Sequence, residues 1–127
     1  MNATERSLMT RAAELCPKRF RVIDTEPPEG IPSERLCVVL SLPHGWSSHK
    51  SRAFELVLLA GVMEEVVGRG WAYELQDGFG GPSALVYRDR RNDLSAYGAG
   101  RSPAFALLAA FVRALESVAP GQQEAQS

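Results

Sequence analysis

Apolar residues recur at the spacing of an α-helix in three segments of the chain, residues 3–15, 49–68 and 102–118. Pro17 follows the first segment and ends it, because proline cannot continue a helix. Gly68 supplies the usual end of the second segment. The pattern therefore predicts three helices, two of them long and strongly apolar.

Serines before the second and third helical segments are suited to cap them, since a serine hydroxyl accepts a hydrogen bond from a free backbone N–H of the first turn. Ser47 or Ser48 precedes the second segment. Ser102 precedes the third, and Pro103 then takes the first helical position, which tolerates its missing N–H. The stretch GAGRSPAFALLAAFVRAL, residues 98–115, is therefore predicted to be a turn, a cap and a packing helix.

Two kinds of strand pattern lie between the helices. Residues 35–42 (RLCVVLSL) are apolar with almost no alternation, as in a strand that is buried on both faces. Residues 71–76, 84–88 and 94–97 alternate apolar and polar positions and are joined by short turns, which predicts an antiparallel meander. Residues 18–25 alternate as well and suit a half-buried strand or an extended arm. The connecting segments, rich in proline, glycine or polar residues, are predicted loops: 26–34, 43–51, 77–83 and 90–93.

The element order α-β-α-β-β-β-α, with residues 18–25 as an extra strand, predicts the α+β class. Because residues 35–42 need cover on both faces, we expect an α/β/α-type sandwich, in which helices flank a mainly antiparallel sheet of about four strands. A length of 127 residues suits a single domain. We place this domain at residues 1–119 and expect a disordered C-terminal tail at residues 120–127.

The helices at 49–68 and 102–118 are apolar over most of their circumference, so each needs more cover than one sheet face gives. One solution is a two-fold homodimer, in which the second of these helices packs against its symmetry mate. The other is a monomer in which the helix at 3–15 folds back over the surplus. Both stay open, and the candidate dimer face consists of Leu107, Phe111 and Val118.

Charge and cysteine usage narrow the function classes. A formal net charge of −1 lacks the basic excess of most nucleic-acid-binding domains. Cys16 and Cys37 form no CxxC pair, so they predict no thiolate zinc site. Free, mostly buried thiols in a reducing cytoplasm are expected, with a disulfide as the alternative. The N-terminal segment has no signal-peptide core and no run approaches the roughly 20 apolar residues of a membrane span, so we expect a cytoplasmic protein.

No pattern predicts catalysis, a metal site or a cofactor. Residues 98–102 (GAGRS) lack the lysine of a P-loop and the third glycine of a dinucleotide-binding turn. His44 and His49 lie five positions apart, with no carboxylate or thiol at a metal-ligand spacing. Glu64 and Glu65 are helix neighbours that point in different directions, whereas paired catalytic carboxylates face each other across a cleft. We expect a protein that is not an enzyme and has no cofactor.

Two basic groups and one aromatic group are candidate binding residues. If the fold brings the basic groups together, they form a face for an anion or a nucleic acid; a solvated, charged strand edge is the alternative. The aromatic residues suit a pocket for a small ligand or belong to the core. The basic candidates are Lys18, Arg19 and Arg21 in the first group and Arg88, Arg90, Arg91 and Arg101 in the second. The pocket candidates are Trp46, Trp71 and Tyr73, while Phe20, Tyr87 and Tyr97 are candidates for stacking on bases.

The segment from the second helix to the end of the third resembles the double-stranded-RNA-binding domain family. Residues 54–116 fit that family's order α-β-β-β-α, and small residues recur at its spacing. These residues are Gly98, Gly100, Ser102, Ala106, Ala109, Ala110, Ala114 and Leu115. Pro103 and Ala104 stand where the family has the lysine pair that contacts phosphate. The resemblance therefore implies a topology more than it implies RNA binding.

Residues 16–116 also resemble a family of small phage and prophage proteins, the phage ABA sandwich domain. The matching pieces are GWSSHKSRAFELV, GRGWAYEL and GRSPAFALLAAF, which begin at residues 45, 68 and 100. They are packing and capping motifs. The resemblance implies a sheet with helices on both faces and supplies no catalytic residue.

These patterns and resemblances predict a non-enzymatic phage or prophage accessory protein in the host cytoplasm. It would bind a host or phage macromolecule, a protein partner first of all, with inhibition of a host defence system as one such role. A nucleic-acid-binding protein of double-stranded-RNA-binding topology and a small-ligand sponge are the alternatives.

Overall fold

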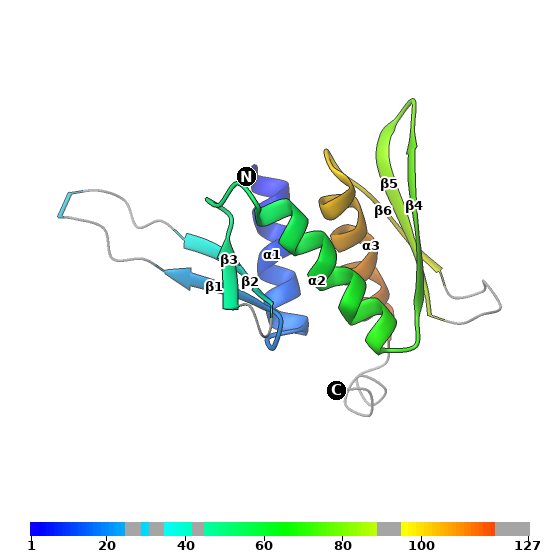
Figure 1. Ribbon diagram of the computed structural model, residues 1–127, viewed down its shortest axis with the longest axis horizontal. Coiled ribbons are helices and arrows are strands. Elements are labelled where there is room, and N and C mark those ends of the chain that lie inside the picture. Colours follow the sequence, from blue (N-terminus) through cyan, green and yellow to red (C-terminus); the bar gives the residue numbers. More distant parts are fainter. Residues whose placement is uncertain (25–28, 31–34, 42–44, 89–94, 119–127) are drawn as a thin grey trace.

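The computed structural model describes residues 1–24, 29–30, 35–41, 45–88 and 95–118, in which the elements follow the order α-β-β-β-α-β-β-β-α (Figure 1). The helices are α1 (Ala3–Leu15), α2 (Phe54–Gly68) and α3 (Pro103–Ser117). The strands of the first half are β1 (Phe20–Asp24), β2 (Arg35–Ser41) and β3 (Gly45–Ser48). The strands of the second half are β4 (Ala72–Gly78), β5 (Gly81–Tyr87) and β6 (Ser95–Ala99).

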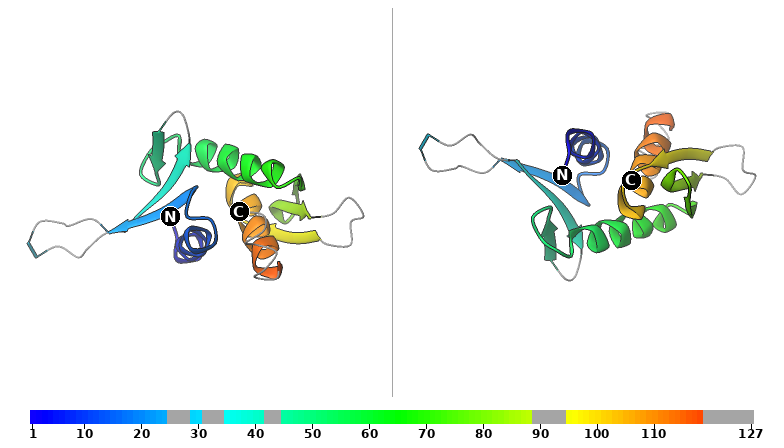
Figure 2. Two further views of the ribbon diagram at one scale, coloured as in Figure 1. Left: turned by 90° about the horizontal axis from the view of Figure 1, so that it is seen from below. Right: turned by 90° about the horizontal axis from the view of Figure 1, so that it is seen from above.

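Two antiparallel sheets lie on opposite sides of the helices in the described part of the chain (Figures 1 and 2). Sheet A has the order β1-β2-β3 and packs on α1 and α2, whereas sheet B has the order β4-β5-β6 and packs mainly on α3. The predicted α+β class is confirmed. The expected single sheet of about four strands with helices on both faces does not match, because each run of three short strands pairs with its sequence neighbours. The apolar helices are thus enclosed by two sheets.

Helix α3 is the central element. Nearly all of its residues are buried, because α1 and α2 contact it from one side and β5 and β6 from the other. Its predicted start is confirmed: the Ser102 hydroxyl accepts a hydrogen bond from the Phe105 N–H at 3.4 Å, and Pro103 occupies the first turn. The helix is apolar over most of its circumference because it has neighbours over most of it, and its exposed positions include Arg113 and Glu116.

The apolar side chains of α3 that one sheet cannot cover are buried by other elements of the same chain. Leu107 and Phe111 are 0% exposed and Val118 is 5% exposed. Helix α1 folds back onto α3, which is the monomeric arrangement considered above. These three side chains cannot contact a second copy, so the dimer face predicted on them is wrong. Among the helices, the exposed large apolar side chains lie instead on α2, where Leu56 is 74% and Val67 is 61% exposed.

Sheet B approaches α3 closely at Gly98, which lies on β6 beside Ala84 of β5. A Cβ atom at Gly98 would stand 2.5 Å from the Ala106 carbonyl oxygen and closer still to the Ala110 nitrogen. At Gly100 a Cβ would stand 2.9 Å from the Ala106 nitrogen. These glycines are therefore required by packing, since only a residue without a side chain lets the strand lie against the helix backbone.

Two predicted loops contain strand residues. Within 43–51, Gly45–Ser48 forms β3 and pairs with β2, which takes Ser47 and Ser48 away from the helix. Helix α2 therefore begins later than expected, at Phe54, and its N-cap residue Ala53 makes no side-chain hydrogen bond. Within 77–83, β4 and β5 extend to the pair Gly78 and Gly81 and form a tight hairpin.

Several sequence predictions concern residues outside the described ranges: most of the loop 26–34, the turn 90–93 and the tail 120–127. Among the residues that are described, no helix has both the length and the apolar character that crossing a membrane requires.

Candidate functional site

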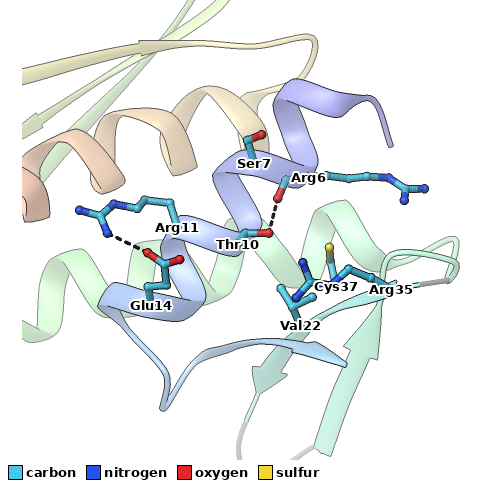
Figure 3. A pocket seen from close by; sticks show the side chains of 8 residues that line it. All are labelled: Arg6, Ser7, Thr10, Arg11, Glu14, Val22, Arg35 and Cys37. Atoms are coloured by element: carbon cyan, nitrogen blue, oxygen red, sulfur yellow. Dashed lines mark hydrogen bonds and ion pairs between the residues drawn. The ribbon is translucent and has the colours of Figure 1, made fainter. Parts of the chain in front are cut away.

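An open groove of about 430 Å³ lies between α1 and sheet A (Figure 3). Five residues of α1 line it at helical spacing, and the facing wall comes from β1 and β2. The lining residues are Arg6, Ser7, Thr10, Arg11, Glu14, Val22, Arg35 and Cys37. Sheet register explains the strand wall, because Val22 pairs with Cys37 and Asp24 pairs with Arg35, so these side chains share the face toward α1.

Positive charge exceeds negative charge in this groove, since three arginines and one carboxylate line it. The Arg11 guanidinium forms ion pairs with Glu14 at 2.8 Å and with Glu116 at 2.9 Å. The Arg35 Nε lies 2.9 Å from the Asp24 carboxylate, and both side chains are exposed. Arg6 donates only a long 3.4 Å bond to the Met1 carbonyl oxygen, and no described carboxylate pairs with it.

Cys37 forms part of the groove wall, but its environment is not that of a nucleophile. Burial raises the pKa of the Cys37 thiol, although Arg6 and Arg35 act in the opposite direction. Its backbone N–H donates to the His49 Nδ1 at 3.1 Å, and its carbonyl accepts from the His49 N–H at 2.9 Å. A reactive thiol needs a lowered pKa and solvent access, and Cys37 has neither.

Cys16 lies at a second, smaller pocket of about 320 Å³ between the end of α1 and the end of α2. Its thiol donates to the Glu65 carboxylate at 3.0 Å, and the Arg69 guanidinium lies 3.9 Å from the sulfur. Burial, reinforced by Glu65, raises the pKa of Cys16 from 9.0 to about 11. Both cysteines are free and buried. This cluster ties α1 to α2 and holds the thiol neutral.

The raised pKa of Cys16 predicts a loss of stability at alkaline pH. Below pH 9 the thiol is protonated in both the folded and the unfolded chain. Between pH 9 and about 11 only the unfolded chain ionises, so folding stability falls as the pH rises. Urea unfolding of the wild type and of Cys16→Ala should show a steeper decline for the wild type in this range. Parallel declines would contradict it.

The basic candidates do not form one face. In the first group, Lys18 and Arg21 are exposed, but Arg19 pairs with Glu64 at 2.9 Å and donates to the Leu40 carbonyl. This group lies at the start of β1 in sheet A. In the second group, Arg88 follows β5 of sheet B, while Arg90 and Arg91 lie outside the described residues.

Arg101 is held by two helices. Its Nε lies 2.6 Å from the buried Glu5 carboxylate of α1, and its Nη1 lies 3.5 Å from Glu55 of α2. Arg101 therefore has a structural role, because its ion pairs link α1 and α2. Because the two basic groups belong to different sheets, the described residues do not unite them (Figure 1).

The aromatic candidates do not form a common pocket either. Trp46 lies on β3 of sheet A, and Tyr73 lies on β4 of sheet B. Trp71 belongs to the core, where its ring packs edge-on against Phe111 with the centroids 6.3 Å apart. Phe20 is fully buried as well, so it cannot stack on a base. These assignments are wrong because the residues are divided between two sheets or enclosed.

The outer face of sheet A, which points away from the helices, is mainly apolar. Phe20 and Val22 pack into the core, so the alternate residues of β1 point outward. Paired residues of an antiparallel sheet share a face. The outer face therefore consists of Arg21, Ile23, Leu36, Val38, Leu40, Trp46 and Ser48. Trp46 is 65% and Ile23 is 45% exposed, whereas Val38 of the middle strand is 2% exposed, so the accessible parts of this face are at Ile23 and Trp46.

Arg6 and Arg35 were missed by the sequence-based search. Arg6 sits on the polar side of an amphipathic helix, and Arg35 opens an apolar strand, so each alone is typical of a solvated charge. Only the packing of α1 on sheet A brings them to one groove. The sequence feature that points to this groove is the presence of basic residues on the polar face of the first helix.

The described residues contain no group of three or more histidine, cysteine, aspartate or glutamate side chains arranged to hold a metal ion. Comparison of the chain with known protein families, with curated proteins and with solved structures gives no match.

Proposed function

We propose that the protein acts by binding a partner protein through the outer face of sheet A, without catalysing a reaction. The observation that carries this proposal is the exposure of Trp46, Ile23 and Arg21 on the same face of sheet A. Tryptophan and arginine are the residues most enriched among the energetic centres of protein interfaces. The partner would offer an apolar patch bordered by a carboxylate, which suits Arg21.

The resemblance to small phage proteins supports a more specific version of this role. In it, the chain is a phage or prophage accessory protein that acts in the host cytoplasm on a host or phage macromolecule, including a component of a defence system. Nucleic-acid binding through the basic groups has less support, because carboxylates already pair with Arg19 and Arg101. Tyr87 likewise donates to Glu74 at 2.9 Å.

Affinity capture with matched variants tests the contact face. Trp46→Ala removes the largest exposed side chain of the face and should eliminate the polypeptides that co-purify with the wild type from the producing cell. Phe79→Ala is the control, because Phe79 is an aromatic residue even more exposed than Trp46 and lies at the β4–β5 turn, on the other sheet. Partners retained by Trp46→Ala, or turnover of a substrate by the purified protein, would contradict the proposal.

A further inference from the structure

We infer that the groove between α1 and sheet A is a binding site for a small organic phosphate, with the phosphate group held between the guanidinium groups of Arg6 and Arg35. This site is separate from the proposed contact face, because it lies on the opposite side of sheet A. Its volume of about 430 Å³ falls within the usual range of small-molecule sites, roughly 300–1,000 Å³.

Of the three arginines that line the groove, Arg6 and Arg35 have side-chain donors that no described carboxylate engages. Arg11 is directed to two carboxylates, Glu14 and Glu116 (Figure 3 shows the first pair). Arg6 has no described carboxylate partner. Among the described residues, the Arg35 guanidinium contacts Asp24 and does so through its Nε, in an exposed pair of the kind that contributes at most about 1 kcal/mol. Its terminal nitrogens remain for a ligand, and guanidinium groups match the geometry of phosphate oxygens.

The side-chain arrangement in Figure 3 supports this assignment. Arg6 and Arg11 extend from α1 in opposite directions, and Arg35 lies with Val22 and Cys37 on the facing strands, on the side of α1 to which Arg6 extends. Cys37 lies close enough that both arginines act to lower the pKa of its thiol, so their positive field reaches the groove wall. A phosphate placed there would meet two cations.

The uncharged part of the wall determines the kind of phosphate. Val22 and Cys37 present apolar atoms beside the two arginines. The Thr10 hydroxyl donates to the Arg6 carbonyl oxygen at 2.9 Å, so its proton is already engaged. The groove therefore offers an apolar surface next to a phosphate-binding pair, which favours a phosphate ester with an organic group over inorganic phosphate.

Calorimetric titration with phenyl phosphate tests this inference, with inorganic phosphate, benzoate and phenol as comparison ligands. We expect phenyl phosphate to bind more tightly than any of the three. The double variant Arg6→Gln, Arg35→Gln should weaken binding about tenfold or more, because each charge-assisted hydrogen bond to the anion is lost. Arg52→Gln removes an exposed arginine outside the groove and should leave affinity unchanged.

A second variant keeps the test independent of the arginines' own contribution to folding. Thr10→Glu places a carboxylate four residues after Arg6 on α1, where it should pair with Arg6 and repel the phosphate. Binding that survives in both variants would overturn the inference, as would equal affinity for benzoate or no binding of phenyl phosphate by the wild type. Trp46→Ala should bind phenyl phosphate like the wild type, which separates this site from the contact face.

Discussion

Gly98→Ala should destabilise the protein by about 3 kcal/mol, the upper end of what overpacking usually costs. The added methyl group would meet the Ala106 carbonyl oxygen and the Ala110 nitrogen, which belong to the backbone of the central helix. Backbone atoms within a helix cannot move aside as the end of a flexible side chain can. The strand β6 must therefore shift away from α3, with loss of buried contacts.

Chemical unfolding of Gly98→Ala, compared with Gly80→Ala, measures this effect. Gly80 lies at the β4–β5 turn, where a Cβ would meet no atom within 4 Å, so the control should change stability little. A loss of about 3 kcal/mol is a large fraction of the roughly 5–15 kcal/mol that stabilises a typical domain. Equal stability of the two variants would show that β6 does not lie against α3 as described.

Phe111→Glu should prevent the chain from folding. Phe111 is 0% exposed, packs against Trp71 and lies beneath the Arg69 guanidinium, whose carbon is 5.2 Å from the ring centroid. Arg69 is already engaged by Glu65, so a glutamate at 111 would be buried with an incompletely compensated charge and a smaller apolar volume. Circular dichroism should show no cooperative thermal transition.

Val67→Glu is the matched control, because Val67 is exposed on α2 and its replacement should leave the transition intact. Light scattering on the wild type and on Phe111→Glu adds a second readout. A wild-type dimer that Phe111→Glu converts to folded monomers would contradict the central position of α3 and restore the discarded dimer face.

The helices were predictable because their signals are local. Pro17 and the Ser102–Pro103 cap fix two of their boundaries through contacts within one turn. β3 was not predictable, since its four residues have no alternation and become a strand only by pairing with β2. The number of sheets depends on whether the strands before α2 pair with those after it, and no local pattern encodes that choice.

The groove shows the same limit for a binding site. Arg6 and Arg35 are far apart in sequence and meet only because Val22 and Cys37 turn one face of sheet A toward α1. The exposed Trp46 was identified as a binding candidate, but its surroundings were wrong, since the strand that carries it was read as a loop. The sequence predicts that Trp46 is suited to binding, but it does not predict which residues surround Trp46 in the fold.

The unequal attachment of the two sheets has a consequence for motion. Sheet B is held by α3, the most enclosed element, whereas sheet A reaches the rest of the molecule mainly through α1 and α2. Proteins open in cooperative units whose free energies follow how each unit is buried. We therefore expect that any partial opening separates sheet A from α1 before it disturbs α3 and sheet B. Such an opening would widen the arginine groove and bring Cys37 into contact with solvent without passing through the unfolded chain.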